Sequence, residues 1–316
     1  MSLSKTRCAW LPRALVLPAL LAVLAIAISI RSTGAAEGGD ASRERRKVVL
    51  IAGKASHPPG EHEHRAGCLL LADHLNRSGL PIEAVVVTDG WPRDASVFDG
   101  ADAVVIYADG GPGHPALPHL DKLRRMADAG AGIGCIHYGV EVPPGEAGRD
   151  FLDLIGGYFE THWSVNPHWD AEFKNLPAHP ITRGIGSFRI RDEWYYHMRF
   201  REGMAGVTPI LTDLPPTETL QRRDGPHSNN PEVRAAVLER KEPQHVMWAS
   251  RRPLAAGESR GFGFTGGHFH KNWRNDDHRR VVLNAVAWIA GVEVPADGVR
   301  SATPTDAEMA ANLDVK

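Results

Sequence analysis

The stretch "ADAVVIYA" (residues 101–108) contains an apolar run that is rich in β-branched residues. Such runs, without polar alternation, are typical of strands that are covered on both faces. Segments of the same kind occur at 47–52 ("KVVLIA"), 82–87 ("IEAVVV") and 132–137 ("GIGCIH"), and helical spacing occurs at 66–76 and 117–130. This alternation of strand and helix predicts a doubly wound α/β fold with a mainly parallel, flavodoxin-like sheet.

The pattern changes after about residue 150, where Trp, Tyr and Pro become frequent. We predict a strand at 260–267 ("RGFGFTGG") and a helix at 277–291. Short strands are expected at Glu172–Lys174, Phe188–Ile190, Val207–Leu211, Ala235–Glu239 and His245–Ala249. We interpret residues 44–292 as one domain and expect the tail, residues 293–316, to pack loosely because it has few apolar residues.

The first 36 residues have the composition of a secretory signal peptide. Basic residues precede an apolar run at 14–30, and small residues follow at Gly34, Ala35 and Ala36. We therefore expect export to the periplasm or the extracellular space, with an uncleaved membrane anchor at 14–30 as the alternative. The full chain has a net charge of −2. Without a basic surface, a nucleic-acid partner is not expected.

Histidine and acidic residues follow four of the predicted strands. Ligands bind outside the carboxyl ends of the strands in an open parallel sheet, so residues that follow strands are candidates for a site. The residues in question are His57, Glu61, His62, Glu63 and His64 after the first strand, Asp109 and His114 after the third, His137 and Glu141 after the fourth, and His268 and His270 after the strand at 260–267. Histidines that follow four strands at the same edge of the sheet indicate a ligand-binding or catalytic site there.

The segment "CIHYG" (135–139) has the spacing of a strand-to-helix elbow, with His137 at the exposed position. Cys135 falls inside the predicted strand, where we expect it to be buried. Covalent chemistry at a cysteine or serine is therefore not predicted.

Several motifs resemble the ThuA-like (trehalose utilisation) family. The resemblance covers roughly residues 46–292 and rests on five landmarks in order: "GAGIGCIH" (130–137), "GGYFETH" (156–162), "HPIT" (179–182), "DEWY" (192–195) and "RGFGFTGGH" (260–268). It implies the fold of class I glutamine amidotransferases without the catalytic cysteine. It also implies glucosides or their 3-keto derivatives as substrates. The Trp-rich segments "SVNPHWD" and "DEWYYHMRF" depart from the family pattern and suggest a different sugar from trehalose.

Two mechanisms fit these residues. In the first, His137 acts with Glu193 or Glu141 in general acid–base chemistry on a sugar, with Asp192 as a further candidate unless it forms a buried ion pair with an arginine. In the second, histidines bind Zn²⁺ or another divalent metal ion. The candidate ligands are His57, His62, His64, His137 and His268, and the candidate substrate-binding residues are Asp109, His162, Trp163, Tyr195, His268 and His270.

We predict a carbohydrate-processing protein whose partner is a small sugar and whose reaction would be hydrolysis, elimination or isomerisation. A non-catalytic sugar-binding or scaffold protein on the same fold is the alternative. The density of titratable residues favours the enzyme, since a pure binder needs aromatic and amide groups more than histidines.

Overall fold

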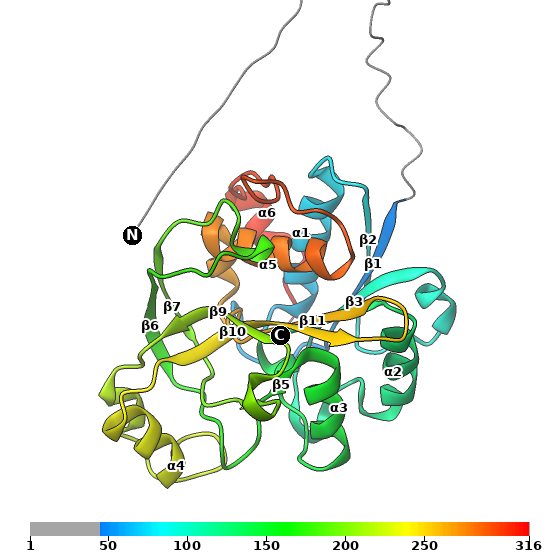
Figure 1. Cartoon of the computed structure of the whole chain (residues 1–316). Coiled ribbons are helices and arrows are strands. Elements are labelled where there is room, and N and C mark those ends of the chain that lie inside the picture. Colours follow the sequence, from blue (N-terminus) through cyan, green and yellow to red (C-terminus); the bar gives the residue numbers. More distant parts are fainter. Residues whose placement is uncertain (1–44, 316) are drawn as a thin grey trace, which may run out of the picture. The chain divides into compact units, whose positions relative to one another are not determined.

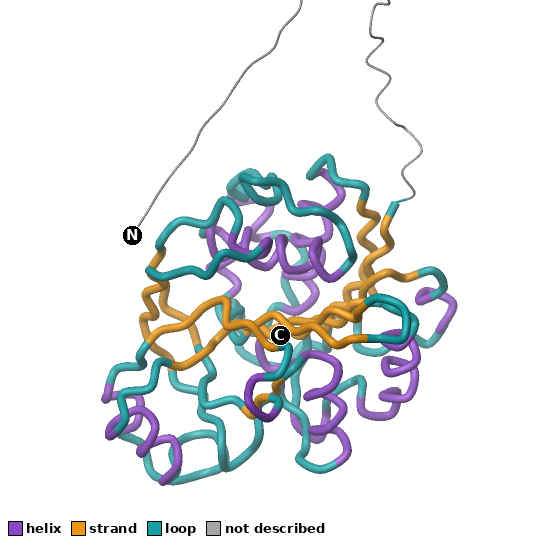
Figure 2. Tube along the Cα trace, viewed as in Figure 1, coloured by secondary structure: helices purple, strands orange, loops and turns teal. Residues whose placement is uncertain are grey.

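The computed structural model describes residues 45–315, so the predicted signal segment, residues 1–36, lies outside the described residues. The central feature is a seven-stranded sheet (Figures 1 and 2). In spatial order its strands are β2 (Ile82–Val87), β1 (Arg46–Ala52), β3 (Ala101–Tyr107), β4 (Gly132–Ile136), β11 (Glu258–Phe264), β10 (Gln244–Pro253) and β9 (Val207–Asp213). The first five are mutually parallel, whereas β10 is antiparallel to both of its neighbours. This confirms the predicted doubly wound, mainly parallel α/β fold and adds an antiparallel edge.

Helices cover both faces of the sheet. Figure 1 shows α1 (His64–Arg77) and α5 (Asp276–Ile289) on one face, and α2 (Leu120–Asp128) and α3 (Glu146–Ile155) on the other. Alternate residues of β1 belong to the two cores: Val48 and Leu50 pack toward α1 and α5, and Val49 packs toward α2 and α3. Two-sided burial explains why these strands have no polar alternation.

The remaining elements lie around this core. Two small antiparallel pairs accompany the large sheet, β6 (His168–Phe173) with β7 (Phe188–Glu193) and β5 (Gly157–Tyr158) with β8 (Arg199–Phe200). The predicted strands at 188–190, 207–211 and 245–249 are confirmed within β7, β9 and β10, and the one at 172–174 is confirmed except for Lys174, which follows the end of β6. Within residues 45–315, every helix is too short or too polar to cross a membrane.

Two predictions about local structure are wrong. Residues 235–239 form a π-helical turn, η8 (Ala235–Glu239), which continues α4 (Pro231–Arg234). The Asn230 side chain caps this helix by accepting from the Val233 amide, and Pro231 occupies its first turn, a combination that starts helices. The tail is not loosely packed: Val294, Val299 and Met309 are buried, and α6 (Asp306–Ala310) begins with a capping box.

Candidate active site

The carboxyl edge of the parallel strands brings together residues from five elements. His62 follows β1, Asp109 follows β3, His137 begins the turn after β4 and His268 follows β11. Glu193 is the last residue of β7, in the small antiparallel pair beside the sheet. This edge includes the point between β1 and β3 where the strand order reverses, the usual place for a ligand in such sheets.

Four of these side chains converge on one point, and we call them the histidine cluster: His62, His137, His268 and Glu193. His62 Nε2 lies 3.0 Å from His137 Nε2 and 3.0 Å from His268 Nδ1. Glu193 Oε2 lies 3.1 Å from His268 Nδ1 and 3.4 Å from His137 Nε2. The Tyr195 hydroxyl is 3.2 Å from both His137 Nε2 and Glu193 Oε2. The four ligand atoms of the histidine cluster, one from each residue, are close enough together that they could hold a metal ion.

The outer hydrogen bonds decide which ring nitrogens carry protons. His62 Nδ1 donates to Asp109 Oδ1 at 2.7 Å, and His137 Nδ1 donates to the Thr265 carbonyl at 2.8 Å. A carboxylate and a carbonyl can only accept, so both Nδ1 atoms must bear hydrogen. In the neutral rings, the Nε2 atoms of His62 and His137 therefore present lone pairs to each other.

The cluster is shielded from water. His62, His137 and His268 are each at most 4% exposed. Burial lowers the pKa of His62, and its hydrogen bond to Asp109 does not outweigh this effect. Burial also acts to lower the pKa of His268 and to raise that of Glu193. Glu193 nevertheless raises the pKa of His268, and His137 and His268 together lower the pKa of Glu193. The site therefore favours neutral imidazole at His62 and an ionised carboxylate at Glu193.

The backbone is bent sharply at two of these histidines. The φ angles of His62 and His137 are 47° and 55°, in the left-handed region that non-glycine residues seldom adopt. Each such residue costs roughly 1–3 kcal/mol, which the surrounding structure must offset. Gly267, with φ of 104°, makes the corresponding bend before His268. The turns at these strand ends thus aim the imidazoles inward.

Asp192 lies behind the cluster. Its side chain is fully buried and accepts hydrogen bonds from the amides of Gly267, His268 and Phe269 at 2.8, 3.1 and 3.4 Å. Its Oδ2 is also 3.5 Å from His278 Nε2. Burial acts to raise the pKa of Asp192, but His278 and the backbone amides lower it to about 2. Asp192 therefore holds the backbone of the loop that carries His268, and does not face the cluster.

Glu141 forms a separate pair with His227, a residue that our sequence reasoning did not select. Glu141 is 2% exposed, and its two carboxylate oxygens lie 3.0 and 3.1 Å from His227 Nε2. The Thr161 hydroxyl also donates to this carboxylate, at 3.3 Å. His227 belongs to the segment "DGPHSNNP", whose Gly, Pro and Asn content indicated only a turn.

His57 and His64 lie around Asp109, outside the cluster. The His57 ring stacks on the His62 ring with centroids 3.5 Å apart, and its Nδ1 is 3.8 Å from Asp109. His64 Nδ1 bonds to the Lys54 carbonyl at 3.2 Å, while its Nε2 is 3.7 Å from Asp109. Burial lowers the pKa of His64 to about 4. His57, His62 and Asp109 form a second, partly exposed group that could hold a cation.

Three other predicted residues do not join the cluster. The His162 amide donates to the Pro226 carbonyl, the Trp163 ring stacks on His197, and His270 Nε2 bonds to the Met309 carbonyl. Conversely, His168 was not selected from the sequence but lies beside the cluster, 4.9 Å from His268 between ring centroids.

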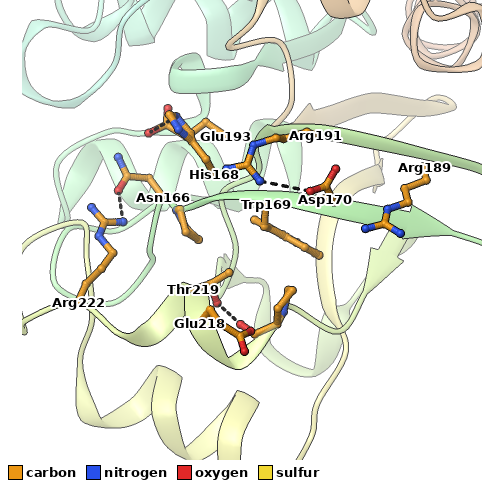
Figure 3. A pocket seen from close by; sticks show the side chains of 12 residues that line it. Asn166, His168, Trp169, Asp170, Arg189, Arg191, Glu193, Glu218, Thr219 and Arg222 are labelled. Carbon is orange, nitrogen blue, oxygen red and sulfur yellow. Dashed lines mark hydrogen bonds and ion pairs between the residues drawn. The ribbon is translucent and has the colours of Figure 1, made fainter.

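A cavity of about 570 Å³ opens beside the cluster, between the β6–β7 pair and residues 216–222. Glu193 and His168 lie at one side of it, and Asn166 and Arg222 at another (Figure 3). The other polar lining residues are Asp170, Arg189, Arg191, Glu218 and Thr219. A hydroxyl-rich molecule of sugar size would find hydrogen-bond donors and acceptors on most sides.

The chain resembles known proteins in sequence and in fold. The sequence profile of the ThuA family, described as trehalose utilisation, matches residues 48–289. A solved ThuA-like protein from Bacteroides uniformis ATCC 8492 is similar at 14% identity and a TM-score of 0.55, over 80% of this chain and 95% of that one. The structure named mmIFT52 N-terminal domain matches at 8% identity and a TM-score of 0.47, over 78% of this chain and 99% of that one. No curated protein matches the chain.

Proposed function

The chain belongs to the ThuA family, whose description implies a carbohydrate-related function, and from this premise we propose that it is an enzyme that uses a divalent metal ion to process a glucoside or 3-keto-glucoside. The metal ion would bind at the histidine cluster. The cavity beside Glu193 would hold the sugar.

One observation carries the proposal: the cluster has more lone pairs than protons. The Nε2 atoms of His62 and His137 face each other at 3.0 Å with both Nδ1 protons committed outward. The Glu193 carboxylate adds negative charge at the same point. Without a cation between them, these atoms would repel one another in a site with little water.

The spacing of the four atoms fits a metal ion. Donors about 2.0–2.2 Å from a common ion lie roughly 3.0–3.5 Å from their neighbours in tetrahedral or octahedral geometry. The neighbouring distances in the cluster range from 3.0 to 3.4 Å. The outer hydrogen bonds of His62 and His137 to a carboxylate and a carbonyl are also those that accompany metal-binding histidines.

The donor set favours a transition metal. Three imidazoles and one carboxylate suit Zn²⁺, Mn²⁺ or Fe²⁺ better than Mg²⁺ or Ca²⁺, which prefer oxygen ligands. Such an ion polarises a carbonyl oxygen or activates a water molecule. A 3-keto-glucoside has a carbonyl between two hydroxyl-bearing carbons and could present both kinds of oxygen to the ion.

The first test is metal content. The full chain would be purified without a tag, dialysed against a weak chelator and analysed by mass spectrometry. We expect about one equivalent of metal, lost in His137→Ala and His268→Ala but retained in the control His245→Gln, whose histidine bonds to Thr212. After reconstitution with Co²⁺, visible absorption bands should report nitrogen ligation. A chain that retains no metal and binds no added Zn²⁺ or Co²⁺ would contradict the proposal.

The second test is turnover of methyl 3-keto-glucosides by the loaded chain, with calorimetry on the same compounds. Turnover that disappears with the metal supports the enzyme. Binding without turnover would instead support the non-catalytic sugar-binding alternative.

We also propose that the protein acts outside the cytoplasm, on the basis of the composition of residues 1–36. Mass analysis of the N-terminus of the protein recovered from each cell fraction tests this. Cleavage after Ala36 in an exported fraction is expected.

A further inference from the structure

If the histidine cluster binds a metal ion, its own side chains are poor proton donors. The Nδ1 protons of His62 and His137 are bonded to Asp109 and the Thr265 carbonyl. Their Nε2 atoms and the Glu193 carboxylate would be occupied by the ion. Cleavage of a glycosidic bond nevertheless requires a proton for the departing oxygen unless the aglycone is unusually acidic. That proton must come from a group beyond the ligands.

We propose that the Glu141–His227 pair supplies this proton, with His227 as the general acid and Glu141 as the residue that orients it. The inference rests on the proposed function and names its reaction, the hydrolysis of a glycoside or 3-keto-glucoside. The bond from the anomeric carbon to the aglycone oxygen breaks, and its electron pair stays on that oxygen. The same oxygen takes the His227 proton, so the aglycone leaves as a neutral alcohol. Water supplies the oxygen for the new bond to the anomeric carbon and the proton that returns to His227.

The geometry of the pair matches this role. His227 Nε2 donates to the Glu141 carboxylate, which contacts it with both oxygens. Nδ1 has no hydrogen-bond partner among residues 45–315, and the imidazole is about one-third exposed while Glu141 is buried. A buried carboxylate thus holds one edge of the ring and leaves the other edge for a substrate.

The charges near His227 favour the protonated ring. The hydrogen bond to Glu141 is the largest effect and raises the pKa of His227, whereas burial and the charge of Arg222 lower it. Glu193 of the histidine cluster also raises it. The Phe159 ring, which stacks on His227 with centroids 5.3 Å apart, carries no charge. A histidinium is therefore available near neutral pH.

Ring contacts connect His227 to the histidine cluster through two intervening aromatic residues. A series of ring contacts joins His137 to Tyr195, Tyr195 to Phe159 and Phe159 to His227, with centroids 4.7, 5.3 and 5.3 Å apart.

The backbone links the pair to the cavity wall. The Asn166 amide donates to the His227 carbonyl at 2.9 Å. Asn166 and Arg222 in turn line the cavity (Figure 3). His227 itself is not among the residues that line this cavity, so the proposal requires the aglycone of a bound sugar to extend past Asn166 to the segment that carries His227.

The experiment compares two leaving groups in the metal-loaded full chain. For His227→Gln we expect kcat on methyl 3-keto-glucoside to fall by about 10²–10⁴, the usual contribution of general acid catalysis. On 4-nitrophenyl 3-keto-glucoside, whose aglycone needs no proton to depart, the loss should be less than about tenfold, with KM little changed. The control His245→Gln should behave as wild type. Equal losses on both substrates would overturn the proposal.

The pH profile and the metal content distinguish a failure of the His227 proposal from a failure of the proposed function. Turnover of the methyl glycoside should fall as pH rises through the pKa of His227, and Glu141→Gln should move that decline to lower pH. Both variants should keep the wild-type metal content, because neither residue is a ligand. A chain that binds metal but cleaves neither glycoside would refute the proposed function.

A measurement without substrate tests the pair itself. Nuclear magnetic resonance of ¹⁵N-labelled histidine in the full chain should show His227 titrating above about 6.5, the ordinary value for histidine, and at lower pH in Glu141→Gln. A wild-type ring that titrates at or below that ordinary value would overturn the assignment of His227 as the acid, whatever the substrate proves to be.

Discussion

Asp192 and Glu193 are neighbours on β7 and both were candidates for catalysis, yet they lie in opposite environments. Asp192 faces four backbone amides and His278 in a site with no exposure. Glu193 faces the ring nitrogens of His137 and His268 and borders a cavity. Successive side chains of a strand point to opposite sides, so one residue supports the loop while the other reaches the cluster.

The difference shows how a structural carboxylate can be distinguished from a functional one. The charge of Asp192 is satisfied by fixed protein donors, which makes the residue part of the fold. Glu193 accepts from the Tyr195 hydroxyl and faces ring nitrogens of His137 and His268, and under the proposed function a metal ion would complete this environment. Four predictions test this contrast.

The largest effect on stability is expected at Asp192. Replacement by Asn removes a buried charge and turns amide hydrogens toward the amides of Gly267 and His268. We expect the free energy of unfolding to fall by about 3–5 kcal/mol in urea titrations. Asp170→Asn on β6, whose partner Arg191 is exposed, is the control and should cost less than about 1 kcal/mol. Similar losses of unfolding free energy in the two variants would contradict the structural role assigned to Asp192.

Glu193→Gln should affect metal binding more strongly than the stability of the fold. Metal affinity should fall by at least about 100-fold, because the variant loses a charged ligand. The free energy of unfolding of the metal-free chain should fall less than it does in Asp192→Asn. Zn²⁺ titration with a competing chelator measures the affinity. Glu218→Gln, which changes a carboxylate in the same cavity but outside the cluster, should bind metal normally.

The pH dependence of stability should show how much the charge of Asp192 contributes to the fold. The pKa of Asp192 is lowered to about 2 in the folded chain, from about 3.9 in the unfolded chain. Its contribution, about 3 kcal/mol, is therefore present above pH 4 and is lost as pH falls through 2. Unfolding measured between pH 2 and 5 should show a shallower decline in Asp192→Asn than in wild type. Parallel curves would contradict the assigned pKa.

The smallest effect is expected at Asp109, which contacts the cluster only through His62. Asp109→Asn should weaken metal binding by about 10- to 100-fold, since a weaker acceptor orients the imidazole less firmly. Asp102→Asn, at a partly buried residue on β3 that pairs with Arg46, should leave the affinity unchanged. If Asp109→Asn also binds normally, the hydrogen bond at 2.7 Å is not needed to align His62.

The sequence alone determined the parallel core of this protein and the edge at which its site would lie. Continuous apolar runs can be buried only if both faces are covered, and this constraint is local and easily recognised. Residues that follow such strands must emerge at one edge, so His62, His137 and His268 could be selected together. The helical turn at 235–239 was missed because short apolar runs do not distinguish a strand from a buried helix.

Only the tertiary structure decided which of these residues meet and what each one does. The parallel direction of the core strands could be inferred from the pattern, but the orientation of β7, which separates Asp192 from Glu193, depends on its packing against the main sheet. The pairing of Glu141 with His227 joins positions 86 residues apart. The protonation of His62 and His137 depends on acceptors from other strands. Such contacts form between residues that are far apart in the sequence, so local periodicity and spacing cannot predict them.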